Sequence, residues 1–282
     1  MKQMNKYLVM ALMLLAAPAH AEINYSKWSW TGPVDANGKL EGTAKLYKPI
    51  TDTFQKPPYY VINGDGSRTA FAPVKGARTS KNTKYTRSEW RELDDNGKEI
   101  AWSLKNGTVF TTIISVEEVG ITTKKEPGGV EVNQFHGVND ELMRLYYKKG
   151  LMSFRNDKSG ATGKEKEFIL LSTKTGKPTN IPLGDKFSTI AEANLKGVTV
   201  TVVYKDEIFV ASDTINSFWL KKENDKFYSK FGVYNAVGAI GSGAGTEGTG
   251  NGKVIVYDAV VSHGTTETPK PTPPAGWCEC PK

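Results

Sequence analysis

The sequence predicts an all-β fold, either a sandwich or a barrel, made of many short strands. Two observations predict it. Segments rich in β-branched residues recur along the chain, and turn signals containing Gly, Pro, Asn or Asp separate them. We expect strands at 107–119, 198–204, 207–211 and 253–262, and turns at 63–66, 94–97 and 127–129.

Two segments are candidates for helix. The segment 141–149 (ELMRLYYKK) fits a short amphipathic helix and a strand equally well, because its Tyr-Tyr pair and flanking turns are typical of strands. We interpret 189–195 as a helical turn.

The two ends of the chain are predicted to lie outside the folded domain. Residues 1–21 have the pattern of an export signal: Lys2 and Lys6, an apolar run from Leu8 to Leu15, and a small-x-small site at 19–21. The apolar run is too short to anchor the chain in a bilayer. We therefore expect a signal peptide at 1–21, one β-domain at 22–263 and a Pro/Thr-rich tail at 264–282, with the protein secreted or periplasmic.

The tail contains both cysteines, Cys278 and Cys280. Neither is placed to staple the core, and two thiolates without a nearby His are an incomplete metal-ligand set. We predict no metal and no cofactor, and the purpose of the Cys pair stays open.

The chain is basic, with a net charge of +7. The signal segment contributes two lysines and no acid, so the remainder keeps a net charge of +5. A basic surface suits an acidic partner, such as nucleic acid, a membrane surface or an anionic polysaccharide. The export signal and the dispersed basic residues argue against nucleic acid. We expect an anionic polysaccharide as partner, no membrane partner and a monomeric protein.

The Gly-rich segment 238–252 (GAIGSGAGTEGTGNG) is predicted to be a loop between two strands. It lacks the Lys-Ser/Thr of a phosphate-binding loop, so nucleotide binding is not expected. A flexible connection and a mobile flap beside a groove are both open.

Three predicted strands place polar side chains on one face, because residues two apart in a strand point the same way. These side chains are Arg87, Glu89 and Arg91 on the first, Gln134 and His136 on the second, and Tyr228, Lys230 and Tyr234 on the third. Each strand alone is ordinary, and a lone strand His is more often structural than catalytic. Together the three predict a groove that binds carboxylates and sugar hydroxyls. His263, beside the tail, is expected to be an ordinary exposed residue.

The three motifs RSEWR (87–91), QFH (134–136) and YSKFGVYN (228–235) resemble, in order and spacing, the signatures of the alginate lyases of polysaccharide lyase family 7. The resemblance covers about residues 25–262. It implies a β-jelly roll sandwich of two antiparallel sheets with a concave substrate groove, and a lyase that needs no metal. Phe135 stands where this family has Ile or Val, and Ala236 where it often has Gln, so no substrate preference is transferred.

The resemblance also implies roles for individual residues. Arg87 and Gln134 would hold the uronate carboxylate, and His136 and Tyr234 would transfer protons. The residues that would position the sugar or brace this set are Glu89, Arg91, Tyr228, Lys230 and Asn235.

This residue set suits β-elimination, in which a base takes the C5 proton of a uronate and an acid protonates the leaving oxygen. Neutralising the carboxylate stabilises the charge that develops at the reacting centre. Neutral His136 suits the base and Tyr234 the acid, although cationic neighbours are expected to lower the pKa of Tyr234, so a tyrosinate base stays open. The sequence thus predicts an alginate lyase. A lyase for another polyuronate, such as glucuronan, and a non-catalytic carbohydrate-binding jelly roll are the alternatives.

Overall fold

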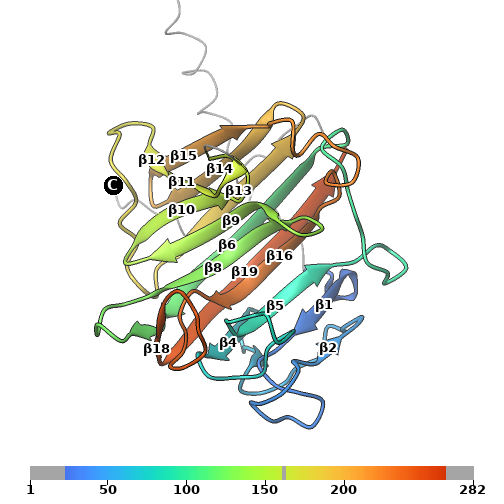
Figure 1. The fold of residues 1–282 in the computed structure, drawn as a ribbon, viewed down its shortest axis with the longest axis vertical. Helices are drawn as coiled ribbons and strands as arrows, with labels where there is room; N and C mark the ends of the chain where they lie inside the picture. Colours follow the sequence, from blue (N-terminus) through green and yellow to red (C-terminus); the bar gives the residue numbers. More distant parts are fainter. Residues whose placement is uncertain (1–22, 161–162, 265–282) are drawn as a thin grey trace, which may run out of the picture.

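The computed structural model describes residues 23–160 and 163–264, and this part of the chain contains no α-helix. Two eight-stranded sheets pack face to face (Figure 1). The predicted all-β sandwich of two antiparallel sheets is confirmed. The predicted signal peptide, the tail after residue 264 and both cysteines lie outside the described residues.

The first sheet, here the β16 sheet, is antiparallel throughout. Its strands, in spatial order, are β11 (Lys166–Ile169), β10 (Leu151–Asn156), β9 (Glu141–Lys148), β8 (Gly129–His136), β16 (Tyr228–Asn235), β5 (Arg87–Glu92), β1 (Trp28–Thr31) and β2 (Leu46–Tyr47).

The second sheet, here the β19 sheet, is also antiparallel. Its strands, in spatial order, are β12 (Leu171–Ser172), β15 (Glu207–Thr214), β14 (Gly197–Tyr204), β13 (Lys186–Asn194), β6 (Thr108–Glu118), β19 (Asn251–His263), β4 (Arg68–Pro73) and β3 (Tyr60–Ile62).

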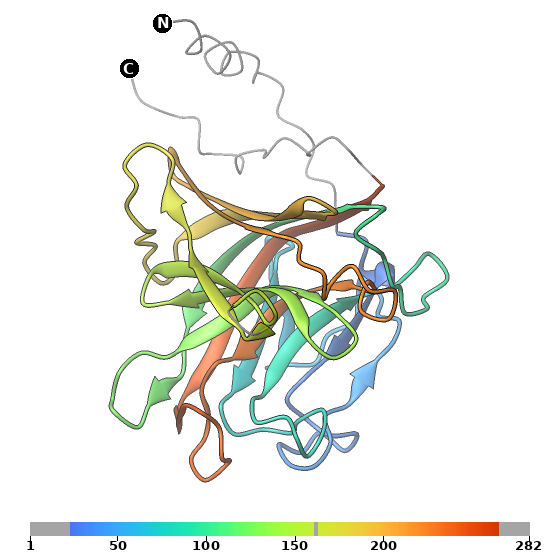
Figure 2. The same cartoon turned by 45° about the horizontal axis from the view of Figure 1, so that its top comes forward.

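A third, small sheet closes one end of the molecule. It consists of β17 (Gly238–Ala239), β18 (Glu247–Thr249) and β7 (Ile121–Thr122). The Gly-rich segment therefore lies beside the turn after β7 in both views (Figures 1 and 2). Its turn is ordered by Glu247, whose carboxylate accepts hydrogen bonds from the backbone N–H groups of Gly241 and Gly243.

The core lies between the two large sheets and is rich in aromatic residues. Trp90 of β5 stacks on Phe231 of β16 with ring centroids 4.8 Å apart, and Trp28 meets the same ring edge-on at 4.7 Å. Burying a side chain of this size contributes about 2 kcal/mol to stability. This packing fixes β1, β5 and β16 from the core side and leaves the other face of β5 and β16 for the polar residues.

Register shifts interrupt the pairing of the central strands, one between β16 and β8 and two between β8 and β9. In β8, Val132 packs in the core while Asn133 bonds to Thr112 and Thr189 of the β19 sheet, so both point inward. The bulge in β16 contains Gly232, whose φ is +124°. An added Cβ there would lie 2.5 Å from the carbonyl oxygen of Ser88, so only glycine fits.

The structure settles both uncertain segments. Residues 141–148 form β9, so the strand alternative is correct there. The helical turn predicted at 189–195 is wrong, because residues 186–194 form β13, which pairs with both β6 and β14. Hydrogen bonds to two neighbouring strands outweigh the weak local helical preference.

Candidate active site

The three motifs lie on adjacent strands at the centre of the β16 sheet, where β16 lies between β8 and β5 (Figure 1). Lys230 of β16 is the register partner of both Arg91 and Gln134. Tyr228 pairs with His136, and Tyr234 pairs with Arg87. Segments about 140 residues apart in sequence therefore form one polar surface, as the shared faces predict.

Glu89 is the centre of this surface, and its side chain is 2 % exposed. Its carboxylate accepts a hydrogen bond from Arg87 Nη1 at 3.1 Å and short bonds from Gln134 Nε2 and Lys230 Nζ. One carboxylate thus links one residue from each of the three strands. Glu89 and Lys230 are buried, so they brace the surface from beneath.

Lys230 illustrates the electrostatic balance of the site. Burial lowers its pKa, and the ion pair with Glu89 opposes that effect. Arg87 lowers the pKa further because two cations lie close together. The ion pair with Glu89 therefore opposes the loss of the proton from Lys230.

Tyr234 is partly buried, with the guanidinium of Arg87 4.4 Å from its ring centroid and the ring of Tyr85 at 5.8 Å. Burial raises the pKa of Tyr234 to about 12, and Arg87 offsets this only in part. The expectation that the pKa of Tyr234 falls below its ordinary value is therefore wrong, because burial outweighs the effect of Arg87. Tyr234 keeps its proton at neutral pH and is suited to donate it.

His136 stacks on Tyr228, with centroids 4.9 Å apart and the planes 15° from parallel. Burial lowers the pKa of His136 to about 3, and the cations Lys230, Arg87 and Arg91 add to this effect. Its Nδ1 lies 2.7 Å from the carbonyl oxygen of Gly137, which can only accept, so Nδ1 carries the proton. The neutral ring therefore has its lone pair on Nε2.

Arg91 and Asn235 complete the predicted set. The guanidinium of Arg91 lies 3.8 Å from the ring centroid of Tyr228 and pairs with Glu99 at 3.0 Å. Asn235 is different, because its side chain is fully buried and donates to Ala72 O and Thr86 Oγ1. Its side chain anchors the end of β16, which fits the bracing role that the resemblance implies, and the residue also borders the cavity beyond Tyr234.

A cavity of about 350 Å³ extends this surface beyond Tyr234. Its wall includes Tyr85, Arg144, Tyr146, Lys148, Arg155 and Tyr234. None of the three sequence motifs includes a residue of β9 or β10. The segment 141–149 nevertheless contributes Arg144, Tyr146 and Lys148 to the wall of this cavity. The alternation of that segment was visible in the sequence, whereas its position beside β8 was not.

Glu131 is a further residue that the sequence does not single out. It is fully buried on β8, and burial raises the pKa of its carboxyl to about 7 against the opposing effect of Arg144. The β8 bulge places it on the face of Gln134, three positions away, where strict alternation would place it on the other face.

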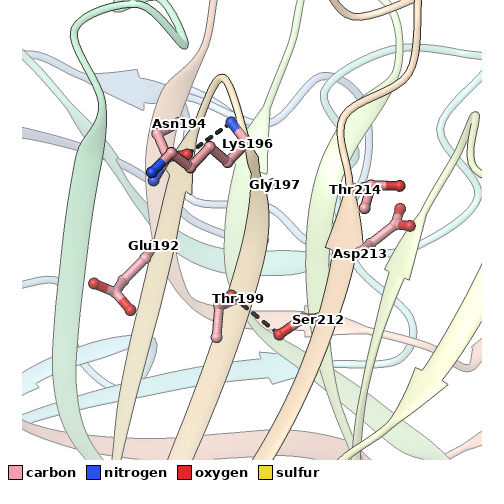
Figure 3. Close-up of a pocket in the computed structure, with 8 residues that line it drawn as sticks. All are labelled: Glu192, Asn194, Lys196, Gly197, Thr199, Ser212, Asp213 and Thr214. Atoms are coloured by element: carbon pink, nitrogen blue, oxygen red, sulfur yellow. Dashed lines mark hydrogen bonds between the residues drawn. The ribbon is translucent and has the colours of Figure 1, made fainter.

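A second hollow, of about 370 Å³, lies on the β19 sheet at β13–β15 (Figure 3). It is lined by small polar and charged residues, and Thr199 hydrogen-bonds Ser212 at 3.0 Å across it. It contains no aromatic, Arg or His side chain. It therefore lacks the residue types that the three motifs bring together in the β16 sheet.

Within residues 23–160 and 163–264, no group of three His, Cys, Asp or Glu side chains is arranged to hold a metal ion. In the same ranges no helix is long and apolar enough to cross a membrane.

Comparisons with known proteins agree with this architecture. An alginate lyase from Klebsiella pneumoniae is 28% identical over 277 residues, covering 81% of this chain and 90% of that protein. The crystal structure of the alginate lyase from Klebsiella pneumoniae has a TM-score of 0.72, with 24% identity over 87% of this chain and 98% of the other.

The family 7 alginate lyase A1-II′, solved in complex with the substrate GGMG, has a TM-score of 0.64 and 22% identity over 86% of this chain and 95% of the other. The alginate lyase family model matches residues 23–263, almost the whole described domain. The chain therefore belongs to the alginate lyase family and is a polysaccharide lyase.

Proposed function

We propose that this protein cleaves alginate, a mannuronate- and guluronate-containing chain, by β-elimination, leaving a 4,5-unsaturated uronate at the new non-reducing end. The observation that carries the proposal is the placement of Arg87, Gln134, His136 and Tyr234 on three adjacent strands around Glu89. The related protein A1-II′ was solved with its substrate as a variant in which one His and one Tyr are replaced. These are the residue types to which we assign proton transfer.

Arg87 and Gln134 are suited to neutralise the substrate carboxylate. Glu89 uses one Nη of Arg87 and one amide N–H of Gln134, which leaves further N–H donors on both. The side chain of Arg87 is 14 % exposed, so part of the guanidinium remains within reach of a substrate. Neutralising this carboxylate makes the C5 proton more acidic, because it stabilises the enolate-like charge of the transition state.

Proton transfer then needs one base and one acid. Nε2 of neutral His136 takes the C5 proton, the electron pair forms the C4–C5 double bond, and the C4–O bond breaks. The hydroxyl of Tyr234 gives its proton to the leaving oxygen. With pKa values of about 3 for His136 and about 12 for Tyr234, the two residues rest in the protonation states that these roles require.

An assay with three polymers tests the proposal. The purified protein is incubated with polymannuronate, polyguluronate and glucuronan, and the ultraviolet absorbance of the new double bond is followed. We expect absorbance with one or both alginate polymers. Absorbance with glucuronan alone would make glucuronan the substrate in place of alginate. Binding without absorbance on any of the three polymers would contradict the proposed β-elimination.

We also propose that residues 1–21 direct export and that the exported protein acts as a monomer. The basic start, apolar run and small-x-small site support the export. N-terminal sequencing of protein recovered from outside the cytoplasm should begin at Glu22, and light scattering should give the mass of one chain. Retention of residues 1–21 would contradict the proposed export signal, and a mass of two chains would contradict the proposed monomer.

A further inference from the structure

Both ring nitrogens of His136 are engaged within the protein. Nδ1 donates to the carbonyl oxygen of Gly137 at 2.7 Å, and Nε2 lies 3.0 Å from Oε1 of Glu141, the first residue of β9. Because the neutral ring carries no proton on Nε2, a hydrogen bond at this contact requires the carboxyl of Glu141 to be the donor. Glu141 thus occupies the nitrogen that a general base needs.

The charges around the two side chains decide where the shared proton lies. Cations face the ring, from β5 and β16, whereas acids face Glu141. The neighbouring titratable and charged groups are Arg87 and Arg91 on β5, Glu131 on β8, Arg144 and Tyr146 on β9, Asp157 after β10, and Tyr228 and Lys230 on β16. Placing the proton on the ring would add a cation beside cations and leave an anion beside anions.

Asp157 contributes most directly to this arrangement. Its Oδ2 accepts the backbone N–H of Glu141 at 2.9 Å, which brings a second carboxylate against the first. Arg144 pairs closely with Asp157, while its Nε is 3.9 Å from Oε2 of Glu141. Burial and the neighbouring Asp157 raise the pKa of Glu141 to about 9, whereas burial lowers that of His136 to about 3.

We propose that Glu141 is a positioning residue for His136: in the substrate-free enzyme its protonated carboxyl donates a hydrogen bond to Nε2, which fixes the ring and its Nδ1–H tautomer. The carboxyl turns away when the sugar enters and Nε2 receives the C5 proton. This inference rests on the proposed function, in which His136 is the base. Glu141 itself takes no part in bond making or breaking.

The first test observes His136 directly and does not depend on turnover. In nitrogen NMR of histidine-labelled protein, with the signals assigned by a His263→Ala variant, His136 should be the neutral Nδ1–H tautomer. Glu141→Gln keeps a neutral donor at the same place, so the tautomer and the low pKa of His136 should persist. Glu141→Ala removes the donor that favours the neutral ring, so the pKa of His136 should rise, although burial and the nearby cations still hold it below its ordinary value. An unchanged His136 in Glu141→Ala would overturn the proposal.

The second test is the dependence of kcat/KM on pH. Above about pH 9 Glu141 becomes a carboxylate that can only accept, so the bond to Nε2 is lost and kcat/KM of the wild type should fall. Glu141→Gln should abolish this fall of kcat/KM at high pH, the alkaline limb of the profile, because an amide does not titrate there. Glu126→Gln, a change at an exposed carboxylate paired with Lys149, is the matched control and should keep the limb.

An alkaline limb that persists in Glu141→Gln would contradict the role of Glu141. Since Glu141→Gln retains the size and bonding of the native side chain, this outcome remains measurable even if Glu141→Ala does not fold. A fully active His136→Ala variant would instead refute the base assignment in the proposed function, so the two failures are distinguishable.

Discussion

Glu89 joins the three motif strands through one carboxylate, since it accepts from Arg87, Gln134 and Lys230. The usual reading of such a residue is a sugar contact, but a side chain that is 2 % exposed has little surface to offer a ligand. Its effect is instead to hold two donors at a fixed spacing and to balance a buried lysine. Precise placement of the groups that bind a substrate contributes to catalysis even when the placing residue does not touch it.

Glu89→Gln tests this role. An amide cannot balance the buried Lys230, and breaking a buried pair costs about 3–5 kcal/mol of the free energy of unfolding. We expect a loss in that range in urea unfolding, together with a lower kcat/KM. Glu41→Gln, at an exposed loop position, is the control and should be near neutral. A Glu89→Gln variant of normal stability would contradict the bracing role.

Tyr234→Phe removes the proposed acid while keeping the ring that Arg87 covers at 4.4 Å. Loss of a general acid lowers rates by about 10²–10⁴-fold, so we expect kcat to fall within that range. Polymer binding, measured by calorimetry or retardation in a substrate gel, should stay close to that of the wild type. Near-normal turnover would show that another group protonates the leaving oxygen.

At the level of the strands, the bulge in β8 decides whether Glu131 shares the polar face. Simple alternation predicts the positions of Gln134 and His136 correctly. It also predicts that Asn235, next to Tyr234, turns inward with Phe231 and Val233. It does not predict that Glu131 joins the polar face, since the bulge in β8 shifts the phase by one residue. Bulges depend on the partner strand, and neither β8 nor β16 specifies its partner by local sequence.

Gly232→Ala tests the bulge in β16. The methyl group would meet the carbonyl oxygen of Ser88 at 2.5 Å, and the φ of +124° is strained for alanine. The backbone strain alone costs about 1–3 kcal/mol, so the midpoint of thermal unfolding should fall. Because Tyr234 follows two residues later, kcat should fall as well. Gly64→Ala, where the added atom has open space, is the control.

The sequence predicts the sandwich and the strands that carry the motifs, because the alternation of β-branched and polar residues is a local property. It misplaces 189–195, where pairing with β6 and β14 decides the conformation. The sequence also does not predict the raised pKa of Tyr234 or the contact between Glu141 and His136. Both depend on burial and on which strands are neighbours, and these are set by the whole chain.

At the level of the whole molecule, His263 connects the two sheets and is not an ordinary exposed residue. Its ring bonds to Glu92 of β5 at 2.5 Å through Nε2 and to Thr108 of β6 at 2.8 Å through Nδ1. Glu92 also accepts the backbone N–H of Ser229, next to Tyr228. The end of the β19 sheet is thereby tied to the end of β16 nearest His136.

His263→Ala should leave the buried Glu92 with one fewer partner. Loss of a hydrogen bond to a buried charged group costs about 1–3 kcal/mol, which for a domain of this size lowers the midpoint of thermal unfolding by several degrees. His263→Gln, which keeps a donor, should recover part of the loss. If His263→Ala melts with the wild type, the link between the sheets contributes nothing to stability.

The position of β16 between β5 and β8 has a consequence for the order of assembly. Among the described strands, β5 and β8 share no hydrogen-bond ladder, and both pair with β16, which begins at Tyr228 and follows them in sequence. Every productive arrangement of Arg87, His136 and Tyr234 therefore has to wait until β16 is inserted between them. A nascent or truncated chain that ends before β16 contains two of the three motifs and has no active site, so the appearance of activity reports completion of the fold.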